Sequence, residues 1–197
     1  MKMRIRLSLA VILALTALSA VNVNARCEHQ STAKSNSQHQ HTSAKDAPYA
    51  LQFLDTFSKH HQDAIEMSRM AVRKAQHREL RGMAKKMITD QQKDVAKMRS
   101  WRNRWYTRHP KAVNMEMPGM SRDMDMSKLK AASGHAFDLA FIDMMTAHHQ
   151  SGIEMAQDAL AKSEHAEVKT LAQKNINMQQ KESEQMNQWK TAWSNSR

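Results

Sequence analysis

Two histidine pairs are the residues most suited to bind a metal ion. His60-His61 and His148-His149 are each followed by glutamine, and both lie in helical patterns of apolar residues. At about 100° per residue, His60 falls within the apolar face of its helix and His61 on its border. Burying an imidazole without a partner costs about 1–3 kcal/mol. Two adjacent imidazoles in each half therefore need partners, which favours metal ligation over a purely structural role.

Methionine is the other abundant ligand type, and it indicates a soft metal. Imidazole suits copper, zinc, iron and nickel, whereas a thioether selects soft ions such as Cu(I). Zinc usually takes Cys, His or carboxylate, and a di-iron bundle needs inward Glu with Glu-x-x-His motifs. No Glu-x-x-His occurs, and Glu66 and Glu154 are predicted to point away from the apolar faces. We therefore expect no inward carboxylate and a copper ligand, Cu(I) by preference, with Cu(II) or Ag(I) as alternatives.

The spacing of the methionines differs between the two histidine pairs. Met144–His148 and Met145–His149 are each four residues apart, the separation at which two side chains on one helix meet. The first pair lacks such partners and has Met83 and Met87 on the following helix instead. The sequence therefore predicts a better site in the second half. Two further methionines lie too far along the helix to share an ion with His60 or His148, and suit either core packing or ligation: Met67 and Met155.

A methionine cluster interrupts the helices between the two halves. The segment 108–134 contains Pro, Gly, Asp and Arg, and we expect it to have no helical face to fill. Exposed methionines at this density indicate a loop that captures a soft metal, although they would also suit a cap on one end of the helices. The cluster comprises Met115, Met117, Met120, Met124 and Met126.

The elements that position these residues form two related halves. Shifting residues 50–105 by 88 positions onto 138–193 needs no gap and gives 22 identities in 56 positions. The low Gly and Pro content predicts long helices, and two amphipathic hairpins must bury their faces together. The predicted fold class is all-α, a ferritin-like four-helix bundle of two duplicated helical hairpins. We place the bundle at 48–195, with hairpins at 49–106 and 135–195 and the methionine-rich linker at 108–134.

The N-terminal region predicts export. Residues 1–25 have a basic start, an apolar run and small residues before a cleavage site, which is typical of a signal peptide rather than a permanent membrane anchor. Residues 26–47 are polar and are expected to be a disordered arm carrying His29, His39 and His41, where Cu(II) binding stays open. The formal charge of +11 falls to +8 without the signal peptide. Export and dispersed basic residues argue against nucleic acid as a partner.

The paired motifs resemble a known family. Each half carries His-His-Gln-x-x-Ile-Glu-Met followed by Gln-Gln-Lys-(Asp/Glu)-x-x-x-Met-x-x-Trp. This arrangement resembles the ferritin-like family catalogued as a domain of unknown function, DUF305, over about residues 49–194. The resemblance implies a periplasmic or secreted copper-binding protein in copper resistance, with both histidine pairs and the associated methionines as the family's core. The first half departs by having Phe57 where the second has Met145.

Three functions are compatible with these residues. The favoured one is a non-enzymatic protein that sequesters Cu(I) or carries it to a copper-efflux system or a copper sensor. This function predicts that replacing His148 and His149 by alanine removes the tightest Cu(I) site while the helical fold survives. The alternatives are a di-metal ferritin-like oxidase, testable by turnover with iron or copper, and a basic polyanion-binding module, testable by salt-sensitive binding without metal.

Overall fold

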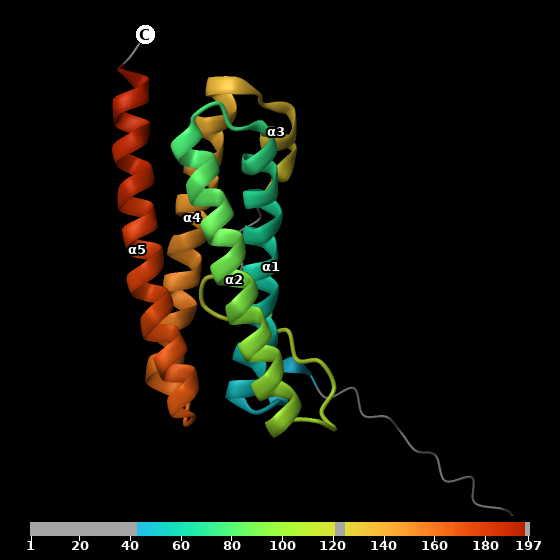
Figure 1. The fold of residues 1–197 in the computed structure, drawn as a ribbon. Coiled ribbons are helices and arrows are strands. Elements are labelled where there is room, and N and C mark those ends of the chain that lie inside the picture. The colour runs from blue at the N-terminus through green and yellow to red at the C-terminus, as the bar shows by residue number, and fades with distance from the viewer. Residues whose placement is uncertain (1–42, 121–124, 196–197) are drawn as a thin grey trace, which may run out of the picture. The chain divides into compact units, whose positions relative to one another are not determined.

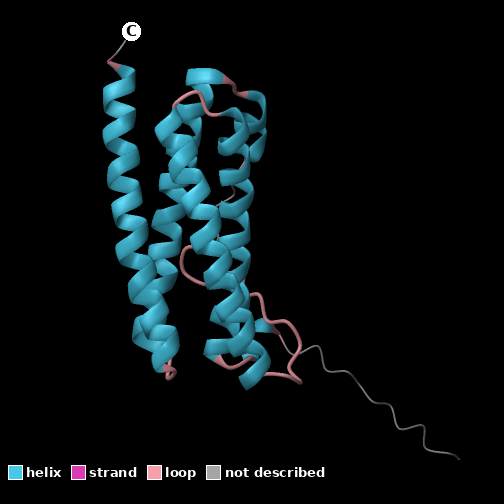
Figure 2. Cartoon of the chain, viewed as in Figure 1, coloured by secondary structure: helices cyan, strands magenta, loops and turns pink. Residues whose placement is uncertain are grey.

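The amphipathic patterns form helices, as expected. The computed structural model describes residues 43–120 and 125–195, so the predicted signal peptide, His29, His39, His41 and Met124 lie outside the described residues. In the described part, regular structure is almost entirely helical, and short loops join the two long helices within each hairpin (Figures 1 and 2). The long helices are α1 (Tyr49–Lys74), α2 (Arg78–Trp105), α4 (Gly134–Lys162) and α5 (Ala166–Ser194), and the short ones are η1 (Ala44–Asp46) and α3 (Met126–Ala131).

The long helices pack as two hairpins. Helix α1 packs against α2, α4 packs against α5, and the hairpins join through α1 and α4. All these helices belong to one compact unit. The duplicated four-helix architecture predicted from the sequence is therefore confirmed.

The apolar core of the bundle is split into two clusters. The Phe57 cluster and the Phe141 cluster each draw on both hairpins. Members of the first are Phe53, Phe57, Met98, Met117, Met155, Val168 and Ile176. Members of the second are Met67, Leu80, Met87, Phe137, Phe141, Met145 and Met186. Each long helix contributes to both clusters, as the spacing of its buried residues requires.

A buried polar layer separates the two apolar clusters. On α1 the histidine pair falls between Phe57 and Ala64, and on α4 the second pair falls between Met145 and Ile153. Helices α2 and α5 contribute amide and carboxylate side chains at the same level. The polar layer comprises His60, His61, Gln91, Asp94, His148, His149, Asn175, Gln179 and Glu182, all buried.

The linker between the hairpins is anchored to α1. The carboxylate of Asp55 accepts a hydrogen bond from the backbone N–H of Ala112 at 2.8 Å, and the Thr56 hydroxyl accepts one from Asn114 N–H at 2.9 Å. The side chain of Asn114 in turn donates to Gln52 Oε1 at 2.8 Å. Polar groups on the first turns of α1 thus hold the linker along that helix.

Most described linker methionines pack against the bundle, which corrects the expectation that this segment has no face to fill. Met117 is 3% exposed within the Phe57 cluster, and Met120 packs against the same cluster. Met126 lies in α3 and packs against the Phe141 cluster. Only Met115, which is 55% exposed, matches the expected exposed residue among these four. The linker wraps the bundle closely enough to bury its apolar side chains.

Within residues 43–120 and 125–195, no helix combines the length and the apolar character needed to cross a lipid bilayer.

Candidate metal centre

The two histidine pairs meet at the junction of the hairpins. His60 on α1 and His148 on α4 are both 4% exposed, and their rings stack with centroids 3.7 Å apart at 24°. The Nε2–H of His60 donates to the carbonyl oxygen of His148 at 3.1 Å. His60 Nδ1 therefore retains its lone pair, and no other group in the described structure bonds to it. One nitrogen of this imidazole is left free to bind a ligand.

The ring of His148 makes fewer hydrogen bonds than that of His60. Neither its Nδ1 nor its Nε2 has a hydrogen-bond partner among the described residues, although the side chain is buried. Leaving buried polar atoms without partners costs about 1–3 kcal/mol each. One unpaired nitrogen of His148 can donate its lone pair to a metal ion, as can the neighbouring Nδ1 of His60.

A glycine on α4 permits this close packing. A Cβ added at Gly152 would lie 2.8 Å from His60 Cε1 and 2.4 Å from Gln179 Oε1. Both distances are shorter than real Cβ contacts allow, so a larger residue at this position would force the α1 imidazole to move. The first half has Ala64 at the corresponding position, so the close approach is specific to one side of the histidine stack.

A cavity of about 870 Å³ adjoins the histidine stack. His60 and His148 line it together with four thioether side chains, from α4, the linker and α3: Met115, Met120, Met126 and Met144. Charged side chains of both signs complete the lining, among them Lys59, Asp63, Asp125, Lys128 and Asp143. The structure thus brings three of the linker methionines to the same cavity as one histidine from each pair.

The other predicted ligands do not line this cavity. His61 and His149 turn into the polar layer instead. Six predicted methionines belong to the apolar clusters or pack directly against them: Met67, Met83, Met87, Met117, Met145 and Met155. Of the two predicted chelates, Met144–His148 opens on the cavity, whereas Met145 is fully buried among apolar side chains.

Buried carboxylates face the second histidine of each pair, so the expectation of no inward carboxylate is wrong. Glu182 Oε2 accepts a hydrogen bond from the Nε2–H of His149 at 3.0 Å. Asp94 lies 4.0 Å from Nε2 of His61. The sequence did contain this signal, because Asp94 and Glu182 correspond under the shift of 88 positions. Asp94 also falls at helical spacing between Gln91 and Met98, on the buried face of α2.

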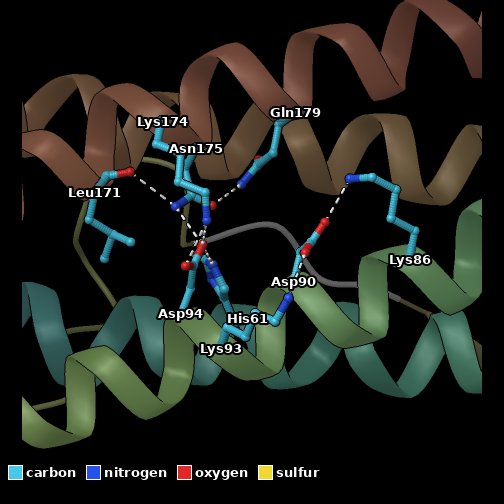
Figure 3. Close-up of polar contacts among 9 residues, drawn as sticks. All are labelled: His61, Lys86, Asp90, Lys93, Asp94, Leu171, Lys174, Asn175 and Gln179. Carbon is cyan, nitrogen blue, oxygen red and sulfur yellow. Dashed lines mark hydrogen bonds and ion pairs between the residues drawn. The ribbon is translucent and has the colours of Figure 1, made fainter.

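The two carboxylates are paired differently. Asp94 accepts hydrogen bonds from Lys174 Nζ at 2.9 Å and from Asn175 Nδ2 at 3.0 Å, which joins α2 to α5 (Figure 3). Glu182 accepts one from His149, and its Oε1 has no partner among the described residues. The carboxylate in the first half is therefore hydrogen-bonded to a lysine, whereas the one in the second half is hydrogen-bonded to its histidine and interacts with Lys86 only electrostatically.

Burial keeps the stacked imidazoles neutral. It lowers the pKa of His60 well below the usual 6.5, and the neighbouring His61 and His149 lower it further. Burial, followed by the nearby His60 and His149, likewise lowers the pKa of His148. Burial lowers the pKa of His61 to about 4, against the opposing effect of Asp94. Neutral imidazoles retain the lone pairs that a metal ion needs.

These lowered pKa values predict that the metal-free protein loses stability in mild acid. In the unfolded chain these histidines titrate near the ordinary pKa of 6.5, so below this pH the unfolded state binds more protons than the folded one. Stability is thus complete above about pH 6.5 and declines as the pH falls toward the folded pKa values, about 4 for His61. Urea unfolding with a chelator at about pH 7.5 and pH 5 should show this decline, and an unchanged free energy of unfolding would contradict it.

The types of side chain at the cavity indicate which metal ions could bind there. In the part of the chain that the structure describes, no three His, Cys, Asp or Glu side chains are grouped so as to hold an ion. Beside the two imidazoles, the cavity offers the four thioethers as further donors. Imidazole with thioether is a soft donor set.

Comparison with known proteins places these features in a family. Residues 50–190 match the family model described as a domain of unknown function, DUF305. The structure of CopM in the Cu(I)-bound form is similar, with a TM-score of 0.64 and 34% sequence identity over 73% of this chain and 96% of that chain. CopM in the Cu(II)-bound form gives a TM-score of 0.65 and 36% identity over 73% of this chain and 97% of that one.

A more distant structure supports the same fold. A DUF305 protein from Streptomyces coelicolor has a TM-score of 0.66 and 27% identity, over 77% of this chain and 94% of that chain. A comparison with curated protein sequences found no match.

Proposed function

Because the chain belongs to the DUF305 family, whose structures include copper-bound CopM, we propose that it binds copper, chiefly Cu(I), at the cavity beside the histidine stack. The observation that carries this proposal is the meeting of His60 and His148 with four thioethers around one cavity, because three of the four ring nitrogens of these histidines have no hydrogen-bond partner among the described residues. The donors would come from His60 Nδ1, a nitrogen of His148 and the sulfurs of the lining methionines Met115, Met120, Met126 and Met144.

Two further observations support a soft ion. The imidazoles are neutral, so a proton does not compete for the lone pairs near neutral pH. CopM, which is about one-third identical to this chain, has also been solved in an Ag-bound form. Ag(I) is a soft monovalent ion like Cu(I), and both suit thioether ligands.

We propose one copper site, and not one in each half, because the two halves differ in the residues that they place at the cavity. Met144 on α4 lines it, whereas the corresponding residue on α1, Thr56, uses its hydroxyl to hold the linker. His60 and His148 contribute to the same site instead of each forming a site of its own. One strong Cu(I) site formed by both halves and the linker replaces the two unequal sites predicted from the spacing of residues along each helix.

We further propose that the protein sequesters or carries copper in the periplasm or after secretion, and delivers it to an efflux system or sensor. The exposed thioether of Met115 at the cavity suits ligand exchange with a partner. The experiment that tests copper binding is an anaerobic Cu(I) titration against a chromophoric competitor, with Zn(II) and Fe(II) compared in parallel. Preference for zinc or iron at the cavity would overturn the proposal.

One observation favours a second candidate function, that of a di-metal oxidase. Glu182 and Asp94 point inward beside histidines, as a carboxylate-based centre would require. Both carboxylates, however, already have hydrogen-bond partners. Asp94 accepts from Lys174 and Asn175, and Glu182 accepts from His149. Copper sequestration therefore remains the better-supported function, and measurable oxidase turnover with iron or copper would favour the alternative.

A glycine in the linker makes it possible to test whether the linker methionines contribute to copper binding. Gly119 has a φ of +82°, and an added Cβ would lie 2.1 Å from the carbonyl oxygen of Ser151 on α4. Gly119→Ala must therefore push the linker away from α4, and we expect Cu(I) affinity to fall roughly tenfold or more as the linker thioethers move. Competitor titration measures this change.

The matched control for this variant is Gly82→Ala on α2. No atom lies within 4 Å of a Cβ added there, so this change should leave copper affinity unaltered and stabilise the helix by about 1 kcal/mol. Equal copper affinity in the two variants would show that the linker does not contribute ligands.

A further inference from the structure

A second group of histidines lies where the α1–α2 turn meets the start of α4 and the end of α5. It consists of His77, His135, Asp138 and Trp193, and none of these residues lines the copper cavity. His135 and His148 both belong to α4, and 13 residues between them correspond to about 20 Å along the helix. The group is therefore separate from the proposed Cu(I) site.

A buried carboxylate fixes the orientation of His77. Asp138, which is fully buried, accepts hydrogen bonds from the backbone N–H groups of Gln76 at 2.9 Å and His77 at 2.8 Å. It also accepts the Nδ1–H of the His77 ring at 2.6 Å. The proton on Nδ1 leaves the lone pair on Nε2. A carboxylate that holds one imidazole nitrogen in this way is the usual support for a histidine that binds metal through the other.

Two rings surround His77. Its imidazole stacks on the indole of Trp193, with centroids 3.6 Å apart at 4°. The ring of His135 meets it at 65°, with centroids 5.9 Å apart. His135 Nε2 is buried and has no hydrogen-bond partner among the described residues. A buried imidazole nitrogen without a partner thus lies next to an imidazole whose Nε2 makes no hydrogen bond within the described part of the chain.

The separation of the two imidazoles leaves room for an ion. Two imidazoles that bind one ion through nitrogens at about 2.0–2.1 Å place their centroids roughly 5–6.5 Å apart. The 5.9 Å between the centroids of His77 and His135 lies in this range. We propose that His77 and His135 form a second metal site, for a borderline divalent cation such as Zn(II) or Cu(II), with water in the remaining positions.

The opposite end of the bundle supplies a natural control. His165 and Trp105 correspond to His77 and Trp193 in the duplication, and they stack in the same way, with centroids 3.8 Å apart at 9°. Nε2 of His165, however, is hydrogen-bonded to the hydroxyl of Tyr106 at 3.2 Å. A histidine–tryptophan stack alone therefore does not make a metal site, and we expect none at His165.

The test is a Zn(II) titration of the full chain, followed by long-range ¹H–¹⁵N NMR of the histidine rings. Zn(II) should shift the Nε2 resonances of His77 and His135 together, with one common affinity, while those of His165 stay unchanged. His135→Gln should weaken Zn(II) binding at His77 at least about tenfold. His165→Gln should leave it unaltered.

Several outcomes would overturn this second site. They are an absence of any Zn(II)-dependent shift at His77 and His135, separate affinities for the two rings, and unchanged binding at His77 in His135→Gln. The wild-type shifts decide the question even if the variant folds poorly. Cu(I) affinity at the cavity plays no part in the readout, so either proposal can fail while the other stands.

Discussion

Replacing His148 with alanine and Met144 with leucine together is expected to lower Cu(I) affinity at least about 100-fold, because both side chains line the cavity and would supply ligands to the ion. The two nitrogens of His148 have no partners in the described structure, so their removal leaves no other polar group unsatisfied. The helical fold should therefore persist. Anaerobic competitor titration measures the affinity, and circular dichroism measures the helix content.

The matched control for this variant is Met145→Leu. Met145 is adjacent in sequence and was an equally good candidate from its spacing to His149, but it is fully buried in the Phe141 cluster. Its thioether should therefore be replaceable with little change in copper affinity. A large loss in Met145→Leu, or unchanged affinity in His148→Ala/Met144→Leu, would show that the cavity is not the Cu(I) site.

Replacing His149 with alanine is expected to have its main effect on stability. Its Nε2–H is the hydrogen-bond partner of Glu182, whose other carboxylate oxygen has none among the described residues. Removing the hydrogen-bond donor of a buried carboxylate leaves that group unsatisfied, so we expect the free energy of unfolding to fall by about 3 kcal/mol. Urea unfolding at neutral pH measures this loss. The sequence-based expectation that the fold survives replacement of both His148 and His149 should thus hold for His148 alone.

His61→Ala is the internal control for the second prediction. It removes an equally buried imidazole and creates a similar cavity, but Asp94 keeps its hydrogen bonds to Lys174 and Asn175. The loss of stability should therefore be smaller than in His149→Ala. In a double-mutant cycle, Glu182→Leu added to His149→Ala should recover part of the loss. Equal losses in the two histidine variants would mean that the cavity, and not the unpaired carboxylate, sets the cost.

The helices and their duplication followed from the sequence alone. Apolar residues recur every three or four positions in both halves, and this local pattern determines which residues of each helix face the core. The identity of His60 and His148 as candidates also followed, since polar residues on a buried face stand out. The sequence thus supplied the helical elements of the fold and two of the residues that line the candidate site.

Only the tertiary structure decided which side chains meet. Met144 and Met145 each lie four residues before a histidine, so their spacing does not distinguish them. They are about 100° apart around α4, however, and Met144 lines the cavity whereas Met145 lies in the apolar core. Contacts between helices far apart in sequence joined His60 to His148 and Glu182 to His149. Packing of the linker against α1 likewise decided that Met117 is buried while Met115 is exposed. Such choices depend on how the helices pack together, which the period of a single helix does not specify.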